Sequence, residues 1–172
     1  MKMYNLEELN YPDFVGAINQ TNVLPGAYDT LSRWINYGNI NKNSHILQIA
    51  CTTGFQSREI SYNTGCSGDA VDLSEIAVNR AKQNQIELLG ENRINYITSD
   101  ANDYLDSVPF KYTHILFGAG LGFFPEPQKT FQKAIEHLEE GGYILASPFY
   151  AVKPVPPEII NEGREVFGIA CL

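Results

Sequence analysis

The sequence predicts an α/β fold with a doubly wound, mainly parallel sheet and helices on both faces. Short, continuous apolar runs recur along the chain, and each is too short for an amphipathic surface helix but suits a buried strand. Segments whose apolar residues recur at helical spacing separate these runs. Strands that alternate with helices imply right-handed crossovers, which build a parallel sheet covered on both faces.

Five segments are expected as strands. The first is followed by turn-forming residues and then a helix, and the second repeats this order. The third follows a helix that ends at Gly90, and the fourth runs into a glycine-rich loop. The expected strands are residues 45–50, 68–73, 94–98, 112–117 and 143–147.

Helices are expected around and between these strands. Residues 13–22 show no clear period, whereas Tyr28 to Ile35 repeat at helical spacing and Gly38 can end that helix. The proline-rich segment 153–157 marks a rigid turn before a last helical stretch. The helices between strands are expected from Ser74 to Gly90, around Tyr104 and Leu105, and from Pro127 to Gly141.

Length and composition are those of one ordinary globular domain. The chain has 172 residues, 44 % of them hydrophobic, against the roughly 100 to 200 residues that one domain needs. Its formal charge of −8 opposes docking on phosphate backbones, so nucleic acid is not an expected partner. The first residues lack a signal peptide and no apolar run reaches the ~18 residues of a membrane span, so we expect a cytoplasmic protein with no membrane partner.

No metal site and no disulfide framework are predicted. The cysteines are odd in number, widely separated and without a CxxC pair, which favours reduced thiols. The histidines lack the spacing of metal ligands. These residues are Cys51, Cys66, Cys171, His45, His114 and His137.

The loops after the first three strands form the candidate binding site, because ligands of such sheets bind outside the carboxyl ends of the strands. Residues 50–54 form a turn of mostly small residues at which a ligand can approach the backbone beside a helix start. Asp72 suits the two hydroxyls of a ribose, or alternatively a cap for the helix that Ser74 begins. Asp100 suits the amine of a purine, with the Ala101 N–H for a ring nitrogen, or alternatively a helix N-cap. Together the three loops favour an adenosine site.

In this order, the loops resemble the motifs of class I S-adenosylmethionine-dependent methyltransferases. Residues 46–55 resemble the first motif, a hydrophobic strand followed by an acid and GxGxG, and residues 71–74 resemble the second, with its ribose-binding acid. Residues 99–101 resemble the adenine-reading third motif, and residues 117–147 resemble the segment from the fourth to the fifth strand.

The resemblance covers about residues 40–150 and implies a Rossmann-like fold, with S-adenosylmethionine as the cofactor and S-adenosylhomocysteine as the product. It implies cofactor contacts at Gln48, Ala50, Cys51, Thr52, Gly54, Asp72, Leu73, Asp100, Ala101, Asn102, Phe117 and Gly118.

The first motif departs from the family pattern. Gln48 replaces the usual acid, so its hydrogen bond near the ammonium of the methionine part lacks charge assistance, and Gln48→Glu is expected to strengthen binding. Ala50 and Thr52 replace two glycines, and the β-branched Thr52 restricts how closely the loop backbone approaches a ligand.

The resemblance implies methyl transfer to a small-molecule acceptor by in-line displacement, which depends mainly on alignment. No catalytic base is assigned, because His114 and His137 fall inside a strand and a helix.

The alternative function is that of a non-catalytic module that binds S-adenosylmethionine or S-adenosylhomocysteine and acts through a protein partner. The altered first motif favours this alternative, whereas the two retained acids argue against it. Candidates for acceptor contacts are Tyr11, Phe14, Asn19, Tyr28, Phe123, Phe149 and Tyr150.

The number of predicted strands is smaller than the number in the family's sheet. The family's sheet has seven strands, but the sequence predicts five, with residues 166–172 as a candidate sixth. We therefore expect the last strands either to be missing from this chain or to be completed by a partner, as in a homodimer. Residues 1–172 form a single domain in this interpretation, with a helical lead-in or lid (1–40), a cofactor-binding core (41–150) and a partial C-terminal segment (151–172).

Overall fold

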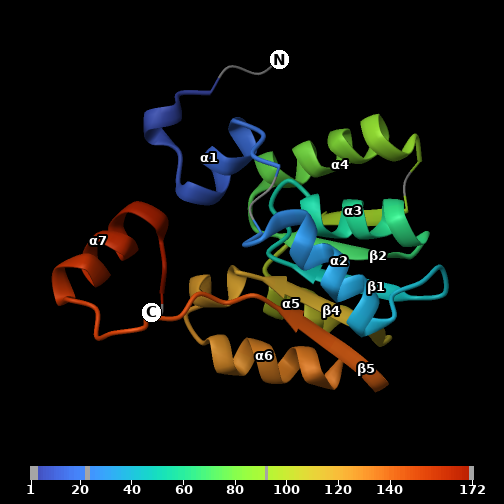
Figure 1. Cartoon of the computed structure of the whole chain (residues 1–172). Coiled ribbons are helices and arrows are strands. Elements are labelled where there is room, and N and C mark those ends of the chain that lie inside the picture. The colour runs from blue at the N-terminus through green and yellow to red at the C-terminus, as the bar shows by residue number, and fades with distance from the viewer. Residues whose placement is uncertain (1–3, 22–23, 92, 171–172) are drawn as a thin grey trace.

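The computed structural model describes residues 4–21, 24–91 and 93–170, and within them it confirms the α/β fold (Figure 1). Five strands form one all-parallel sheet in the order β3-β2-β1-β4-β5. Because β1 pairs with both β2 and β4, the strand order reverses beside β1. The strands are β1 His45–Ile49, β2 Ser67–Asp72, β3 Ile94–Thr98, β4 Tyr112–Gly118 and β5 Leu138–Ala146.

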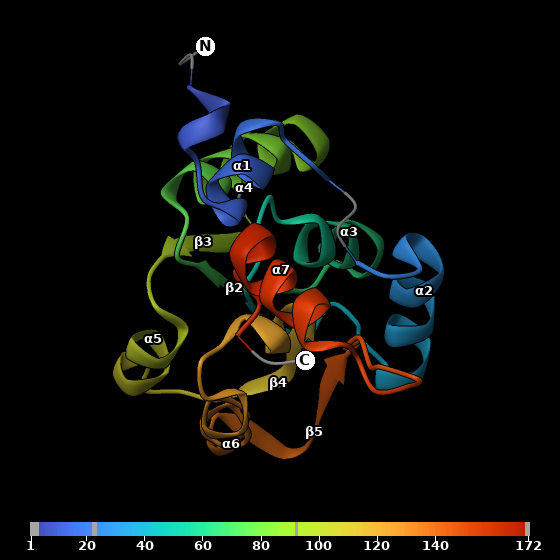
Figure 2. The same ribbon diagram turned by 90° about the vertical axis from the view of Figure 1, so that its left-hand side faces the viewer.

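Helices cover both faces of this sheet (Figure 2). One face carries α2 (Ala27–Gly38), α3 (Phe55–Thr64) and α4 (Glu75–Leu89), and the other carries α5 (Ala101–Ser107) and α6 (Pro127–Glu136).

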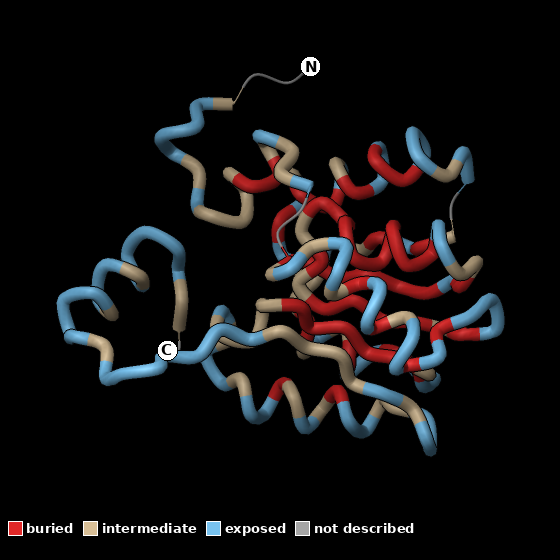
Figure 3. The backbone as a smooth tube through the Cα atoms, viewed as in Figure 1, coloured by how far each residue is buried: buried red, intermediate tan, exposed pale blue. Residues whose placement is uncertain are grey.

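Two hydrophobic cores follow from the alternation of side chains along each strand. Ile46 packs into the core beneath α2, α3 and α4, whereas Leu47 and Ile49 pack into the core beneath α5 and α6. Burying one such side chain contributes roughly 1.5 to 3 kcal/mol. Figure 3 shows that the buried residues concentrate in the central strands β1, β2 and β4 and in the helix faces turned toward them.

The remaining helical elements lie toward the carboxyl ends of the strands. They are η1 (Leu6–Glu8), α1 (Tyr11–Ala17), η2 (Gly120–Phe123) and α7 (Pro157–Phe167). In Figure 1, α7 stands apart from the sheet on the side to which the arrowhead of β5 points, and no residue of α7 is buried. The first helix packs closely on α4, because a Cβ atom at Gly16 would lie 2.5 Å from the backbone nitrogen of Ala77.

Two sequence-based boundaries are wrong. The helix expected to run to Gly141 ends at Glu136, and β5 begins at Leu138 rather than at residue 143. Leu138 pairs with Tyr112, the chain bulges over residues 139–142, and regular pairing resumes between Tyr143 and His114.

The candidate sixth strand at residues 166–172 is also not formed in the described residues. Val166 and Phe167 belong to α7, which begins at Pro157 and ends before the left-handed Gly168. Ile159, Ile160, Val166 and Phe167 recur two helical turns apart, and this helical period overrides the apolar content of the segment. Residues 171–172 lie outside the described residues.

Candidate functional site

The loop between β1 and α3 has a left-handed backbone at alternate residues. The φ angle is 56° at Ala50, 47° at Thr52 and 77° at Gly54. Glycine adopts this conformation freely, whereas it costs other residues roughly 1 to 2 kcal/mol, and a β-branched residue is a true outlier there. The two positions where the resemblance expects glycine therefore keep a glycine-like backbone while carrying larger side chains.

Gln48 holds this loop from the inside of the protein. Its Oε1 accepts a hydrogen bond from the backbone N–H of Ser57 at 2.9 Å, and its Nε2 donates to the carbonyl of Cys51 at 3.5 Å. The side chain has no exposed surface. Both ends of the amide thus join the loop to α3, and the cofactor contact that the resemblance implies for Gln48 stays a prediction.

Asp72 joins the first loop to the second. Its Oδ2 accepts from the backbone N–H of Thr52 at 2.8 Å, and its Oδ1 accepts from that of Ser74 at 2.9 Å. The N-cap of α4 is Ser74, whose hydroxyl accepts from the N–H of Ala77. Burial raises the pKa of the Asp72 carboxyl although both hydrogen bonds favour the charged form. Since a carboxylate has about four acceptor positions, each oxygen of Asp72 keeps capacity for a further donor.

The third loop is organised by Asp100, which is the N-cap of α5. Its Oδ1 accepts from the N–H groups of Asn102 at 2.7 Å and Asp103 at 3.3 Å. The capping alternative is therefore confirmed, but this cap uses neither Oδ2 of Asp100 nor the N–H of Ala101. In the second loop, Leu73 is 68 % exposed directly after Asp72, so an apolar surface is available beside the acid.

The end of β4 touches the start of α3. Gly118 has a φ angle of 55°, and a Cβ atom there would lie 2.3 Å from Nε2 of Gln56. A Cβ atom at Gly120 would lie 3.0 Å from the Cβ atom of Ala50. The end of β4 and the segment after it therefore contact the start of α3 and the loop after β1, beside the reversal of strand order.

Two other predicted site residues have side chains in the interior. The ring of Phe117 belongs to the core and packs against Phe131. Cys51 is fully buried, and burial together with the nearby Asp72 carboxylate raises the pKa of its thiol. The side chains of these two residues are therefore enclosed in the interior of the protein.

Three buried side-chain atoms among the described residues lack a hydrogen-bond partner, and all three belong to this edge of the sheet. They are Thr52 Oγ1, Gln56 Oε1 and Asn102 Oδ1. A buried polar group without a partner costs roughly 1 to 3 kcal/mol, and most proteins avoid this. Sequence reasoning missed Gln56, because a glutamine in the first turn of a helix carries no signal of its own.

Aromatic side chains from three distant parts of the chain pack against one another. Two of these parts, α1 and α7, lie in front of the sheet in Figure 2. The ring of Tyr11 in α1 stacks on that of Phe123 in η2 with centroids 5.9 Å apart. Phe167 in α7 meets Tyr11 edge-on at 5.4 Å, and the N–H of Ala170 donates to the carbonyl of Gly122. We call Tyr11, Phe123 and Phe167 the aromatic lid.

The other candidates for acceptor contacts do not join the aromatic lid in one cluster. The Asn19 amide exchanges hydrogen bonds with Asn84, and the ring of Tyr28 packs edge-on against Phe55. Phe14 is partly buried in α1, while Phe149 and Tyr150 are exposed after β5.

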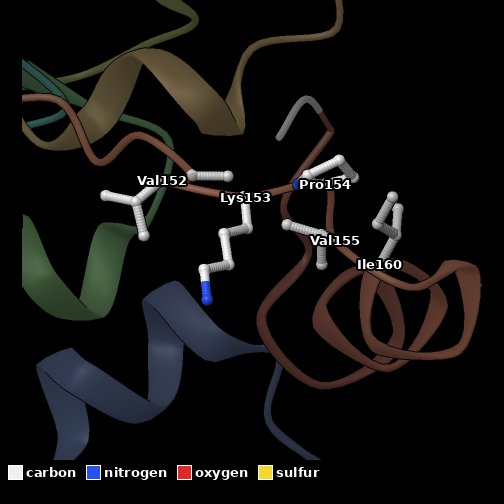
Figure 4. Close-up of a pocket in the computed structure, with 6 residues that line it drawn as sticks. Val152, Lys153, Pro154, Val155 and Ile160 are labelled. Atoms are coloured by element: carbon white, nitrogen blue, oxygen red, sulfur yellow. The ribbon is translucent and has the colours of Figure 1, made fainter.

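Other features lie away from the three loops. His114 contacts Thr113 Oγ1 and the carbonyl of Gly38, and His137 contacts the carbonyl of Phe110. A surface pocket of about 420 Å³ lies between β5 and α7 and is lined by residues 151–155 and Ile160 (Figure 4). Within the described ranges, no three His, Cys, Asp or Glu side chains gather as a metal site, and no helix has the length and apolarity to cross a membrane.

A parallel sheet of this order, with one acid at the end of β2, another in the loop after β3 and a left-handed loop after β1, defines a class I S-adenosylmethionine-dependent methyltransferase fold. Residues 40–171 match the family model described as a methyltransferase domain. The chain belongs to this methyltransferase family.

Solved structures show the same fold. The crystal structure of MccD protein has a TM-score of 0.74 and 32 % identity, covering 88 % of this chain and 66 % of that one. A methyltransferase from Geobacter sulfurreducens in complex with S-adenosylhomocysteine has a TM-score of 0.73 and 18 % identity, covering 90 % of this chain and 62 % of that one.

A third structure, phosphoethanolamine N-methyltransferase 2 from Haemonchus contortus, has a TM-score of 0.78 and 18 % identity, covering 96 % of this chain and 40 % of that one. The chain therefore spans less than two thirds of the length of each of these proteins. No curated protein matches the chain.

Proposed function

We propose that this chain binds S-adenosylmethionine at the three loops and transfers its methyl group to a small-molecule acceptor. The observation that carries the proposal is the position of Asp72, which ends β2 and fixes the loop after β1 through the Thr52 N–H. Family membership and the S-adenosylhomocysteine complex of the Geobacter sulfurreducens protein support it.

The residues present suit each part of the cofactor. Asp72 has acceptor capacity for ribose hydroxyls, and Leu73 offers an apolar surface for adenine. Asp100 Oδ2 and the Ala101 N–H, which the α5 cap does not use, form a carboxylate and donor pair for the adenine edge. The unpaired buried atoms of Thr52 and Asn102 lie in the first loop and in the first turn of α5. A ligand that supplies hydrogen-bond partners would remove the free-energy cost of leaving these atoms unpaired.

The cofactor would supply an electrophilic methyl group on a sulfonium. The chain's own part is to hold the reactants in line, and orientation of this kind lowers a barrier by up to about 7 to 11 kcal/mol. The aromatic lid lies where it can exclude water from the carboxyl ends of the strands. No side chain is assigned as a general base.

Titration calorimetry with S-adenosylmethionine tests the binding half of the proposal. We expect micromolar binding that Asp72→Ala weakens at least tenfold. The variant removes the acceptor for the ribose hydroxyls and the hydrogen bond from the Thr52 N–H that holds the loop after β1. Asp106→Ala removes an exposed carboxylate of α5 that pairs with Lys133 of α6, and this control should leave the affinity unchanged. No binding at millimolar cofactor would refute the proposal.

Analysis of the thioether product tests the chemistry. A sulfonium has three carbon substituents, so the thioether that remains shows which bond to sulfur broke. Methyl transfer to metabolite fractions releases S-adenosylhomocysteine, whereas release of methylthioadenosine would mean attack at a different carbon. Tight binding without any released thioether would instead favour the non-catalytic binding module.

A further inference from the structure

Gln56 has an unusual position for an amide. It is the second residue of α3 and only 3 % exposed, and its Oε1 is buried without a hydrogen-bond donor. Because such an acceptor costs stability, its presence needs a reason other than folding. A ligand that brings a donor is one such reason.

The surroundings of this amide place it between two loops of the site. A Cβ atom at Gly118 would lie 2.3 Å from Nε2 and 3.0 Å from Oε1 of Gln56, so the amide lies directly against the backbone at the end of β4. Its helix begins directly after Gly54 of the β1 loop. The amide therefore lies where the strand order reverses, which is the place where doubly wound sheets bind ligands.

The other glutamine near this loop already has a hydrogen-bond donor for its oxygen. Oε1 of Gln48 already accepts from the Ser57 N–H, and its Nε2 points to the Cys51 carbonyl. The site therefore lacks the acid of the family pattern at residue 48, and it has a second amide, in the first turn of α3, whose oxygen has no donor.

We propose that the side-chain carbonyl of Gln56 accepts a hydrogen bond from the α-ammonium group of the cofactor's methionine part. This inference rests on the proposed function and adds a binding residue to it. An ammonium group has only donors, which suits a lone acceptor, whereas the carboxylate of the same methionine part has only acceptors and does not. The terminal torsion of glutamine is broad, so the amide can turn toward a ligand at small cost.

Calorimetry with three ligands tests this contact in the full chain. The ligands are S-adenosylhomocysteine, its deaminated analogue that keeps the carboxylate, and methylthioadenosine, which lacks the amino-acid part. We expect Gln56→Met, a change of similar volume, to weaken S-adenosylhomocysteine binding about tenfold, because a hydrogen bond to a charged group is lost. The affinities of the other two ligands should change less than twofold. Gln56→Glu should bind S-adenosylhomocysteine at least as tightly as the wild type, because its contact becomes an ion pair.

The melting temperature of the ligand-free variant separates this role from a structural one. Replacing an unpaired buried acceptor by an apolar group is neutral or stabilising, so Gln56→Met should melt at the wild-type temperature or above it. A lower melting temperature with unchanged S-adenosylhomocysteine affinity would overturn the inference, as would equal losses for all three ligands. If the wild type binds methylthioadenosine but Gln56→Met leaves the affinity for S-adenosylhomocysteine unchanged, only this inference fails. If the wild type binds none of the three ligands, the proposed function fails as well.

Discussion

The backbone N–H of Thr52 donates to the carboxylate of Asp72 across 2.8 Å, although the two residues lie 20 positions apart in the sequence. One partner sits in a left-handed conformation that threonine rarely adopts, and the other is a buried acid with a raised pKa. Both features are unfavourable for folding alone. Backbone strain and buried charge of this kind gather at ligand sites, where the surrounding structure enforces them.

Relief of the loop strain is the first prediction. Ala50→Gly should raise the free energy of unfolding by roughly 0.5 to 1 kcal/mol, because the gain from a relaxed left-handed φ exceeds the entropy that glycine loses. Thr52→Gly should raise it further, since it also removes the unpaired buried hydroxyl. Urea denaturation measures both.

Ala151→Gly is the matched control for that series. Ala151 is exposed and lies outside the left-handed region, so glycine should be neutral or slightly destabilising there. Equal effects at Ala50 and Ala151 would show that the loop is not strained.

The pH dependence of stability should report on Asp72. Its folded pKa is raised above the unfolded value of about 3.9, so the folded state binds more protons than the unfolded state between the two values. The contribution of Asp72 to stability is therefore fully present below about pH 4 and falls as pH rises through the folded pKa. Asp72→Asn should remove this part of the pH dependence of the free energy of unfolding.

Urea denaturation at closely spaced pH values, from about 3 to 8, measures that pH dependence through the unfolded pKa. The stability difference, wild type minus Asp72→Asn, should decrease with rising pH. A difference that grows with pH would mean that the hydrogen bonds from Thr52 and Ser74 outweigh burial.

The contact between Gly118 and Gln56 leads to a prediction with an internal control. Gly118→Ala meets both a left-handed φ and a steric clash with the Gln56 amide, whereas Gly90→Ala meets a φ of 68° with nothing within 4 Å. Gly90→Ala should cost about 1 kcal/mol, and Gly118→Ala about 1 to 3 kcal/mol more, since overpacking adds to the conformational term. Thermal denaturation measures both variants.

A second substitution separates the two components at Gly118. Gln56→Ser shortens the opposing side chain, so adding it to Gly118→Ala should recover the steric part and leave the conformational part. If the double variant is no more stable than Gly118→Ala alone, the clash at residue 118 does not involve the Gln56 side chain.

Gln48→Glu should have the opposite effect to the one that the sequence alone predicts. A carboxylate at this position would face the Cys51 carbonyl, to which the amide now donates, inside a fully buried environment. We expect a loss of roughly 1 to 3 kcal/mol in stability and no gain in affinity for S-adenosylmethionine. Tighter binding by this variant in calorimetry would contradict this expectation and would indicate that residue 48 contacts the cofactor, as the family resemblance implies.

The positions of the strands, the two acids and the small-residue loop were predictable from sequence because each depends on local chemistry. Apolar runs identify buried strands, and Asp72 ends β2 as expected, whereas β3 ends at Thr98 and Asp100 follows it as the N-cap of α5. The end of α6 and the start of β5 were harder to predict from the sequence, because pairing of Leu138 with Tyr112 overrides the helical period there. The helix at 157–167 was misjudged near its end, where apolar content and helical spacing indicate different structures.

The sequence by itself therefore determined the sheet, its direction and the edge that binds ligands, since hydrophobic period and turn residues act over a few neighbours. Only the tertiary structure decided which polar groups at that edge are already used. Gln48 and Gln56 look equivalent in the sequence, yet one amide joins two elements and the other keeps an unpaired oxygen. That difference arises from contacts between β1, α3 and β4, and such contacts exist only after the chain has folded.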